Sequence, residues 1–360
     1  MTKRSDILDF IRWVAAFMVV SGHIRSILFN DYSASIHNPI YKALYFVTGF
    51  GHQAVIVFFV LSGYLIGRSV VAQLKNGKFN LSNYLISRFS RIYIVLLPAL
   101  ILTWLVDKTG TFIDQKGIYT SCDYITSLQK DPAGRLTILH FLSSLTMLQN
   151  IWLPVLGSNG PLWSLSPEFW YYMIFPALAG IFFYRFNYKR FLISILIIFI
   201  FLYFSPLSVI SYFLIWLCGL LAYFIKPQNL IIRYLSLAAF GITLCYSRIY
   251  DLNFTCELAI AVTLALALTT FDDHEKILKA KWFNQKMASF SYSLYLIHYP
   301  VGLFILIAID RFITPIVKIE MNFYSLFLYL LTLIIIYFIS YFFAKATEYK
   351  TSDLKKILIR

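Results

Sequence analysis

The chain has 360 residues, of which 59% are hydrophobic and only 13% are charged. A soluble domain carries about 25% charged residues, so this composition excludes an ordinary soluble protein and predicts a surface that mostly faces lipid. The net charge of +14 does not indicate nucleic-acid binding, because the basic residues fall in short loops between apolar segments.

Apolar segments long enough to cross a bilayer recur along the chain. A spanning helix needs about 20 mainly apolar residues. Ten candidates occur in chain order, at 7–27, 44–67, 84–106, 161–184, 190–206, 208–225, 231–249, 254–270, 287–309 and 322–344. An eleventh segment, 138–156, is apolar but short, and a proline lies near its end.

The distribution of basic residues predicts the orientation, because cytoplasmic loops are rich in Lys and Arg. If the amino terminus is cytoplasmic and 138–156 does not cross, 22 of the 31 basic residues lie on the cytoplasmic side. One crossing by 138–156 would invert everything after it and remove this bias. We therefore expect an all-α membrane bundle of about ten transmembrane helices, with 138–156 re-entrant or interfacial and both termini cytoplasmic. Residues 1–360 are expected to form one membrane domain.

The cysteines do not indicate a metal site. Cys122, Cys218, Cys245 and Cys256 show no C-x-x-C spacing and no neighbouring histidine cluster, which zinc sites usually have. Cys245 and Cys256 could meet in a disulfide, although isolated cysteines in apolar surroundings are the favoured alternative. No bound metal is expected.

Two ionisable residues share one face of the first predicted span. Ionisable groups within spans are costly in lipid and usually functional. Arg12 and His23 are eleven residues apart, which places them on one helix face, about 16 Å apart along the axis. The alternative is structural: Arg12 extends to the interface, and His23 is hydrogen-bonded in a contact between helices.

Two arginines lie at the cytoplasmic edge of the third span. Arg88 and Arg91 are spaced i, i+3, so they share a helix face. Two guanidinium groups so placed could hold a phosphate. The spacing alone favours the simpler interpretation that both arginines set the topology of the span.

A carboxylate lies inside the span at 161–184. Glu168 follows the sequence Trp163-Ser164-Leu165-Ser166-Pro167 and lies about two turns into the apolar segment. A carboxylate there needs a partner or a proton. His23 and Arg12 are the expected partners, and a purely structural ion pair is the alternative.

A polar stripe lies in the span at 287–309. Ser291, Tyr295 and His298 follow the spacing i, i+4, i+7 and face one way. They could form hydrogen bonds between helices or line a hydrated reaction chamber.

These residues belong to five segments that resemble motifs of membrane acyltransferase family 3, the O-acetyltransferases of surface polysaccharides and related acceptors. Arg12 and His23 match its R-x10-H pattern, and FFVLSGYL at 58–65 resembles its FFxLSGFL segment. The other three are RFSRIY at 88–93, WSLSPE at 163–168 and SYSLYLIH at 291–298. The five motifs occur in the same order as in the family, and the resemblance extends over essentially the whole chain. The family often has Glu-Pro after its last core helix, whereas Tyr349 follows Glu348 here, so the role of Glu348 carries over only weakly.

The resemblance implies an enzyme that moves an acyl group, expected to be acetyl, from cytoplasmic acyl-CoA to a hydroxyl group. The acceptor would be a carbohydrate or glycolipid at or beyond the outer face of a bacterial inner membrane. Acetyl-CoA would be a donor substrate, and no tightly bound cofactor is expected. The alternatives are a transporter or flippase with a polar site at the midplane, although no paired halves are visible, and a membrane sensor that lost catalysis.

The resemblance also implies roles for individual residues. His23 would be the general base, since the ordinary pKa of histidine lies near working pH, or it would carry the acyl group itself. Glu168 would orient the His23 imidazole or accept its charge. Arg12, Tyr295 or His298 would stabilise the thioester oxyanion. The residues expected to bind acyl-CoA are Arg88, Arg91, Ser62 and Ser291.

Overall fold

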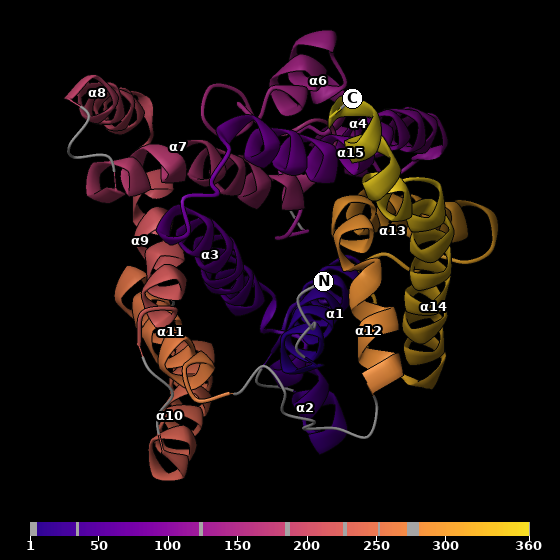
Figure 1. The fold of residues 1–360 in the computed structure, drawn as a ribbon. Helices are drawn as coiled ribbons and strands as arrows, with labels where there is room; N and C mark the ends of the chain where they lie inside the picture. The colour runs from indigo at the N-terminus through magenta and orange to yellow at the C-terminus, as the bar shows by residue number, and fades with distance from the viewer. Residues whose placement is uncertain are drawn as a thin grey trace.

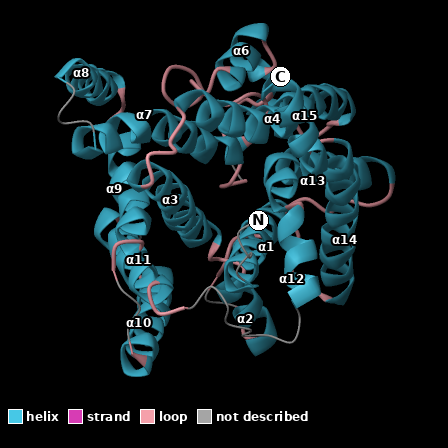
Figure 2. Cartoon of the chain, viewed as in Figure 1, coloured by secondary structure: helices cyan, strands magenta, loops and turns pink. Residues whose placement is uncertain are grey.

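The computed structural model of the chain describes residues 6–33, 36–121, 125–183, 188–225, 229–250, 253–271 and 281–359. Within these ranges the chain is helical and forms no named strand, as Figure 2 shows. The expected all-α fold class is therefore confirmed for the described ranges. Outside them lie Cys122 and several of the basic residues counted above, namely Lys3, Arg4, Arg185, Lys226, Lys276, Lys279 and Arg360.

The helices follow one another closely along the chain. The first half contains α1 (Asp6–Leu28), α2 (Pro39–Val47), α3 (Gly51–Lys75), α4 (Leu81–Ile113), α5 (Ile118–Ser121), η1 (Ala133–Arg135), α6 (Ile138–Leu145), η2 (Gly160–Ser164) and α7 (Leu165–Phe183). The second contains α8 (Tyr188–Phe204), α9 (Leu207–Ala222), α10 (Leu230–Ile249), α11 (Phe254–Leu268), α12 (Lys281–Ser289), α13 (Ser291–Phe312), α14 (Phe323–Ala346), η3 (Glu348–Lys350) and α15 (Thr351–Ile359).

Asparagine side chains define where several helices begin. Asn38, Asn80, Asn229, Asn253 and Asn322 precede α2, α4, α10, α11 and α14, and each side chain accepts a backbone N–H of the first turn. The first N–H groups of a helix have no partner within the helix, and an Asn cap supplies one. The asparagines between the apolar segments therefore determine the residues at which these helices begin.

The ten predicted spans all fall on helices. Six helical segments in the described ranges are long and apolar enough to cross a bilayer, namely Asp6–Leu28, Pro39–Lys75, Leu81–Ile113, Leu230–Ile249, Ser291–Phe312 and Phe323–Ile359. Three further apolar helices, Phe191–Phe204, Leu207–Ala222 and Phe254–Leu268, are shorter. A total of ten crossings stays a prediction. The predicted span 44–67 is interrupted, because α2 ends at Val47 and α3 begins at Gly51.

The segment 138–156 does not form one long helix. Its only helix in the structure is α6, which has eight residues and is therefore about 12 Å long, too short to cross a hydrocarbon core of about 30 Å. The apolar side chains of Ile138, Leu139 and Leu142 are exposed on it. A full crossing by this helix is therefore excluded by its length, and the re-entrant or interfacial placement of 138–156 stays a prediction.

The centre of the molecule is formed by α1, α3, α4 and α13. Helix α1 packs on α3 and α13, and α13 packs on α4. Figure 1 shows α3 and α1 in the interior and α8 and α10 at the edge. Most apolar side chains of α8 are exposed, and those of α10 include the exposed Ile231, Leu235 and Ile242. An exposed apolar surface of this kind matches contact with lipid.

Two glycines allow α3 and α9 to cross closely. A methyl group added at Gly63 would clash with the backbone carbonyl of Trp216, and one added at Gly219 would clash with that of Val60. Small residues allow such close approach of helices in membranes. This crossing positions Trp216 beside Ser62.

A buried polar cluster holds the segment before η2 against α4. The carboxylate of Asp107 accepts from the backbone N–H of Ser158 at 2.7 Å and from its hydroxyl at 2.8 Å. The amide of Asn159 donates to Thr103 and to the backbone carbonyl of Leu296, both at 2.9 Å. The segment therefore links α4 to α13 and positions Trp163 and Ser164 in η2.

The three cysteines in the described ranges, Cys218, Cys245 and Cys256, are free. The disulfide considered between Cys245 and Cys256 is not formed, so these two are isolated cysteines.

Candidate active site

The first cavity in the centre of the molecule is lined by arginines. It has a volume of about 240 Å³ and lies among α1, α3, α4, α7 and α13. Seven of the nine residues predicted to be functional line it, namely Arg12, Ser62, Arg88, Arg91, Glu168, Ser291 and Tyr295. We call it the arginine cavity.

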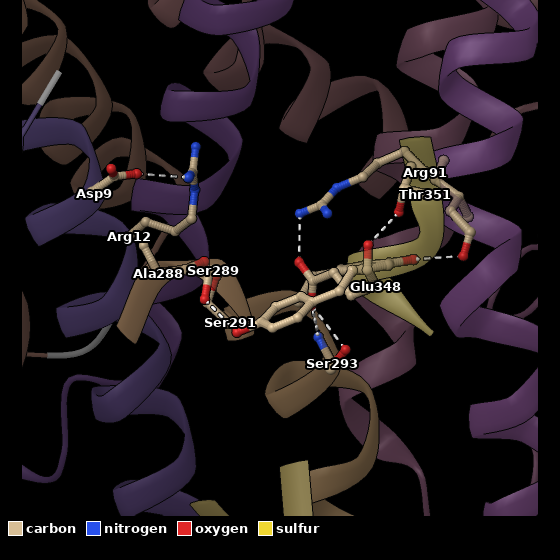
Figure 3. A network of polar contacts seen from close by, with 12 residues as sticks. Asp9, Arg12, Arg91, Ala288, Ser289, Ser291, Ser293, Glu348 and Thr351 are labelled. Atoms are coloured by element: carbon tan, nitrogen blue, oxygen red, sulfur yellow. Dashed lines mark hydrogen bonds and ion pairs between the residues drawn. The ribbon is translucent and has the colours of Figure 1, made fainter. Parts of the chain in front are cut away.

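Arg91 is held in an ion pair at this cavity. Its Nη2 lies 2.7 Å from Oε1 of Glu348, which is buried in η3 (Figure 3). The other carboxylate oxygen of Glu348 accepts from the backbone N–H and the hydroxyl of Ser293, at 3.0 and 2.8 Å. Glu348 thus joins α4, α13 and η3, a contact that the sequence motifs indicated only weakly.

Arg88 has a different environment. Its guanidinium lies over the rings of Tyr84 and Tyr172, 5.9 Å from each centroid. Its Nε is buried without a hydrogen-bond partner, and no carboxylate of the described residues forms an ion pair with it. Of the two arginines, Arg88 is therefore the one whose charge is available to an anionic ligand.

Glu168 lies at the end of a chain of hydrogen bonds. The indole N–H of Trp216 donates to the hydroxyl of Ser62 at 3.1 Å, and that hydroxyl lies 2.9 Å from the hydroxyl of Tyr172. The Tyr172 hydroxyl donates to the carboxylate of Glu168. The chain runs from α9 through α3 to α7, so the close crossing of α3 and α9 positions it.

The partner of Glu168 differs from the expectation. We expected His23 or Arg12, whereas the hydrogen bond comes from Tyr172, one turn further along α7. Arg12 pairs with Asp9 at 3.1 Å, and His23 contacts His298. The expectation was wrong because a residue at i+4 on the same helix is already within reach, while His23 lies at a second cavity.

The second cavity has a volume of about 480 Å³ and is lined by residues of α1 and α3 together with η2 and the segments before α3 and η1. We call it the histidine cavity. His23, Arg25, His52 and Trp163 are among its lining residues. Only Val55 and Tyr295 line both cavities, so the two side chains form the boundary between them.

His23 forms a pair with His298 across α1 and α13. The Nδ1 of His23 lies 2.9 Å from the Nε2 of His298, and the two rings are nearly parallel at 11°. His298 is buried and lines neither cavity. Tyr299 packs edge-on against His23, with the ring centroids 5.1 Å apart.

The contacts of His298 determine the protonation pattern of the pair. Its Nδ1 lies 2.8 Å from the carbonyl oxygen of Tyr295 and 3.1 Å from that of Leu294. Carbonyl oxygens only accept, so this nitrogen carries the proton, and the Nε2 of a neutral His298 has the lone pair. It accepts from the Nδ1–H of His23. The Nε2 of a neutral His23 is then the basic atom of the pair.

Tyr295 is tied to η2. Its hydroxyl lies 2.7 Å from that of Ser164 and donates to the carbonyl of Pro161 at 3.1 Å. Ser291, one turn earlier on α13, donates to the carbonyl of Ala288. The three residues of the predicted polar stripe on α13 therefore have two different environments. Ser291 and Tyr295 line the arginine cavity, and His298 contacts His23.

The sequence reasoning missed a second histidine with a carboxylate. The Nε2 of His52 lies 2.6 Å from Glu257, and the hydroxyl of Tyr212 donates to the same carboxylate at 3.2 Å. The ring of His52 stacks on Trp163 at 10°, with the centroids 6.0 Å apart. His52 and Glu257 each lie in the first turn of an apolar helix. An ionisable residue at the start of an apolar segment is a sequence signal that could have indicated both.

Metal ligation has no support in the described ranges, where no three His, Cys, Asp or Glu residues are grouped to hold an ion. Fold and cavities together define a helical membrane protein with two adjoining internal cavities, one of which is lined by a histidine of the His23–His298 pair.

The chain belongs to acyltransferase family 3, since the family model described as an acyltransferase domain matches residues 6–349. It is therefore an integral membrane protein of an acyltransferase family. One similar protein is the acyltransferase MdmB of Streptomyces mycarofaciens, 29% identical over 174 residues. That match covers 47% of this chain and 38% of the relative, so the chain spans well under two thirds of it. No solved structure matches the chain at a significant level.

Proposed function

We propose that the protein transfers an acyl group, in the first place acetyl, from acyl-CoA to a hydroxyl of a carbohydrate or glycolipid acceptor. The donor enters the arginine cavity from the cytoplasm, and the acceptor enters the histidine cavity from the opposite side of a bacterial inner membrane. The observation that carries this proposal is that His23, bonded to His298, lines a cavity that shares the boundary residues Val55 and Tyr295 with the arginine cavity.

The donor is bound by Arg88. Coenzyme A carries phosphates at the end remote from its thioester, and a guanidinium without a carboxylate partner suits them. Arg91 is neutralised by Glu348 and keeps the start of α13 in place. Ser62, Ser291 and Glu168 line the path of the pantetheine arm. Arg12 lines the same cavity and is paired with Asp9.

The transfer begins at His23. Its Nε2 removes the proton of the acceptor hydroxyl as the hydroxyl oxygen attacks the thioester carbonyl. The tetrahedral intermediate then expels the coenzyme A thiolate, which takes the proton from His23. Formation of the ester is balanced by loss of the thioester. An acyl-His23 intermediate is the alternative route.

The neighbours of His23 support this chemistry. His298 holds the tautomer and orientation of His23 through the Nδ1–H bond, so it is a positioning residue. Tyr295 lies at the boundary through which the thioester must pass. Its hydroxyl, which donates to the carbonyl of Pro161 in this structure, would stabilise the oxyanion after turning towards it. Glu168 offsets the charge of the arginines and does not orient the imidazole.

The test uses purified protein in lipid nanodiscs with labelled acetyl-CoA and a panel of glycoside acceptors. We expect His23→Ala to lower ester formation at least about 100-fold, since general base catalysis contributes about 10²–10⁴-fold. The matched control is His37→Ala, which removes an exposed histidine. A His23→Ala protein that is normally inserted and active would exclude the proposal. Uptake of labelled acceptor without thioester turnover would favour a transporter instead.

A further inference from the structure

The histidine cavity contains a cation that no carboxylate in the described ranges neutralises. Arg25 stands on α1 two residues after His23 and lines the same cavity. Its guanidinium lies 5.1 Å from the ring centroid of Tyr45, and its Nε is buried without a hydrogen-bond partner. No carboxylate of the described residues forms an ion pair with it, because nearby Asp31 pairs with Lys318 at 2.8 Å.

A second arginine increases the positive charge at this end of the cavity. Arg248 donates to the backbone carbonyls of Tyr45 and Phe46, at 3.1 and 3.4 Å. The two cations contact the same tyrosine and repel each other, and a half-buried guanidinium without a counter-ion is costly. The arrangement suits an anion that arrives with the ligand.

The other wall of the cavity suits a sugar ring. Trp163 is half-buried and lines the cavity beside His52. Glu257 and Tyr212 hold His52 from behind, so its imidazole has a defined orientation and can hydrogen-bond a ligand hydroxyl. A flat aromatic face with a few oriented polar groups is a common arrangement in ligand pockets.

We infer that the histidine cavity is the acceptor site and that it selects an acidic sugar unit, one that carries a carboxylate or a phosphate. Arg25 pairs with the anionic group, Trp163 packs on the ring, and His52 hydrogen-bonds a hydroxyl. The acceptor hydroxyl to be acylated is thereby presented to His23. This inference rests on the proposed acyltransferase function and adds the chemical class of its acceptor.

The experiment compares acceptors that differ only in charge. Purified protein in nanodiscs receives labelled acetyl-CoA with the methyl glycoside of a hexuronic acid, the matching neutral hexoside, or a hexose 1-phosphate. We expect the acidic acceptors to have a KM at least about tenfold lower than the neutral one, in line with a charge-assisted hydrogen bond. The uronate and phosphate arms tell the two anionic groups apart.

The variants test Arg25 directly. Arg25→Gln is expected to abolish the preference for acidic acceptors, so that the ratio of the KM values for the neutral and acidic glycosides falls from about ten or more to about one. Arg25→Lys is expected to keep part of the preference, since it keeps the charge. The control Arg311→Gln removes an exposed arginine at the end of α13 and is expected to behave as wild type. Gel filtration and thermal unfolding check that each variant is folded.

The outcomes are separable. Turnover without a preference for acidic acceptors, or a preference that survives in Arg25→Gln, would overturn the acceptor class and leave the acyltransferase function standing. Absence of thioester turnover by the wild type with every acceptor would overturn both.

Discussion

At the scale of single residues, the two arginines of the RFSRIY motif have different environments although they share a helix face. Arg91 is paired with the buried Glu348, while Arg88 lies between two tyrosine rings. An arginine neutralised by the protein contributes mainly to structure, and one without a carboxylate can bind a substrate anion. The motif therefore combines a structural and a binding function.

This difference predicts separate effects of the two substitutions. Arg88→Ala should raise the dissociation constant for acetyl-CoA about tenfold or more, because a hydrogen bond to a charged group contributes about 1.5–3 kcal/mol. Arg91→Ala should instead lower the free energy of unfolding by about 1–3 kcal/mol, because Glu348 loses a partner while buried. Isothermal titration and thermal unfolding in nanodiscs measure the two quantities. Lys78→Ala, an exposed basic residue near the start of α4, is the control.

Equal effects of the two arginine substitutions on binding, with no loss of stability for Arg91→Ala, would contradict this assignment. In that case both arginines would bind the donor, and Glu348 would be released when acyl-CoA arrives.

At the scale of helices, the crossing of α3 and α9 positions the hydrogen bonds that end at Glu168. The glycines at 63 and 219 leave no room for a side chain because each faces a backbone carbonyl of the other helix. Ser62 and Trp216 lie beside this crossing and bond to each other. A shift of α9 would therefore move the wall of the arginine cavity.

We predict that Gly63→Ala and Gly219→Ala each destabilise the protein by about 1–3 kcal/mol, the usual cost of overpacking. Both should also weaken acetyl-CoA binding, because Ser62 moves. The control is Gly241→Ala in α10, where an added methyl group meets nothing within 4 Å. Thermal unfolding of the three variants checks this, and wild-type stability of Gly63→Ala would show that the helices can separate without cost.

At the scale of the whole molecule, the polar residues form two cavities separated by Val55 and Tyr295. Arg12 lines one cavity and His23 lines the other, so the predicted stripe on α1 is shared between them. A donor and an acceptor that enter from opposite sides would meet at this boundary. The orientation of the bundle then decides which substrate comes from the cytoplasm.

Cysteine labelling in cells tests the proposed orientation. In a variant without the native cysteines, Asn76→Cys lies at the end of α3 and His37→Cys just before α2. Both positions are exposed, and they flank the candidate span Pro39–Lys75 on its two sides. A membrane-impermeant maleimide should label His37→Cys in intact cells and Asn76→Cys only after permeabilisation. The reverse pattern would invert the proposed orientation and place the arginine cavity outside the cytoplasm.

The sequence by itself determined the helical membrane class, the approximate helix positions and the acyltransferase family. These depend on local apolar runs, on capping residues such as Asn80 and Asn322, and on short motifs, all of which are readable along the chain. The helix break at 48–50 was not foreseen, although Gly49 lies within it and Gly51 directly follows it, and glycine commonly marks the end of a helix.

Only the tertiary structure decided which ionisable groups meet. His23 and His298 are 275 positions apart, and His52 and Glu257 are 205 apart, so no local pattern relates them. Glu168 is the exception, since its partner Tyr172 lies four residues further along the same helix, a spacing that is readable from the sequence. The physical reason is that a buried polar group binds whichever partner helix packing brings within about 3 Å, and periodicity reports the face of a helix but not the neighbour that it contacts.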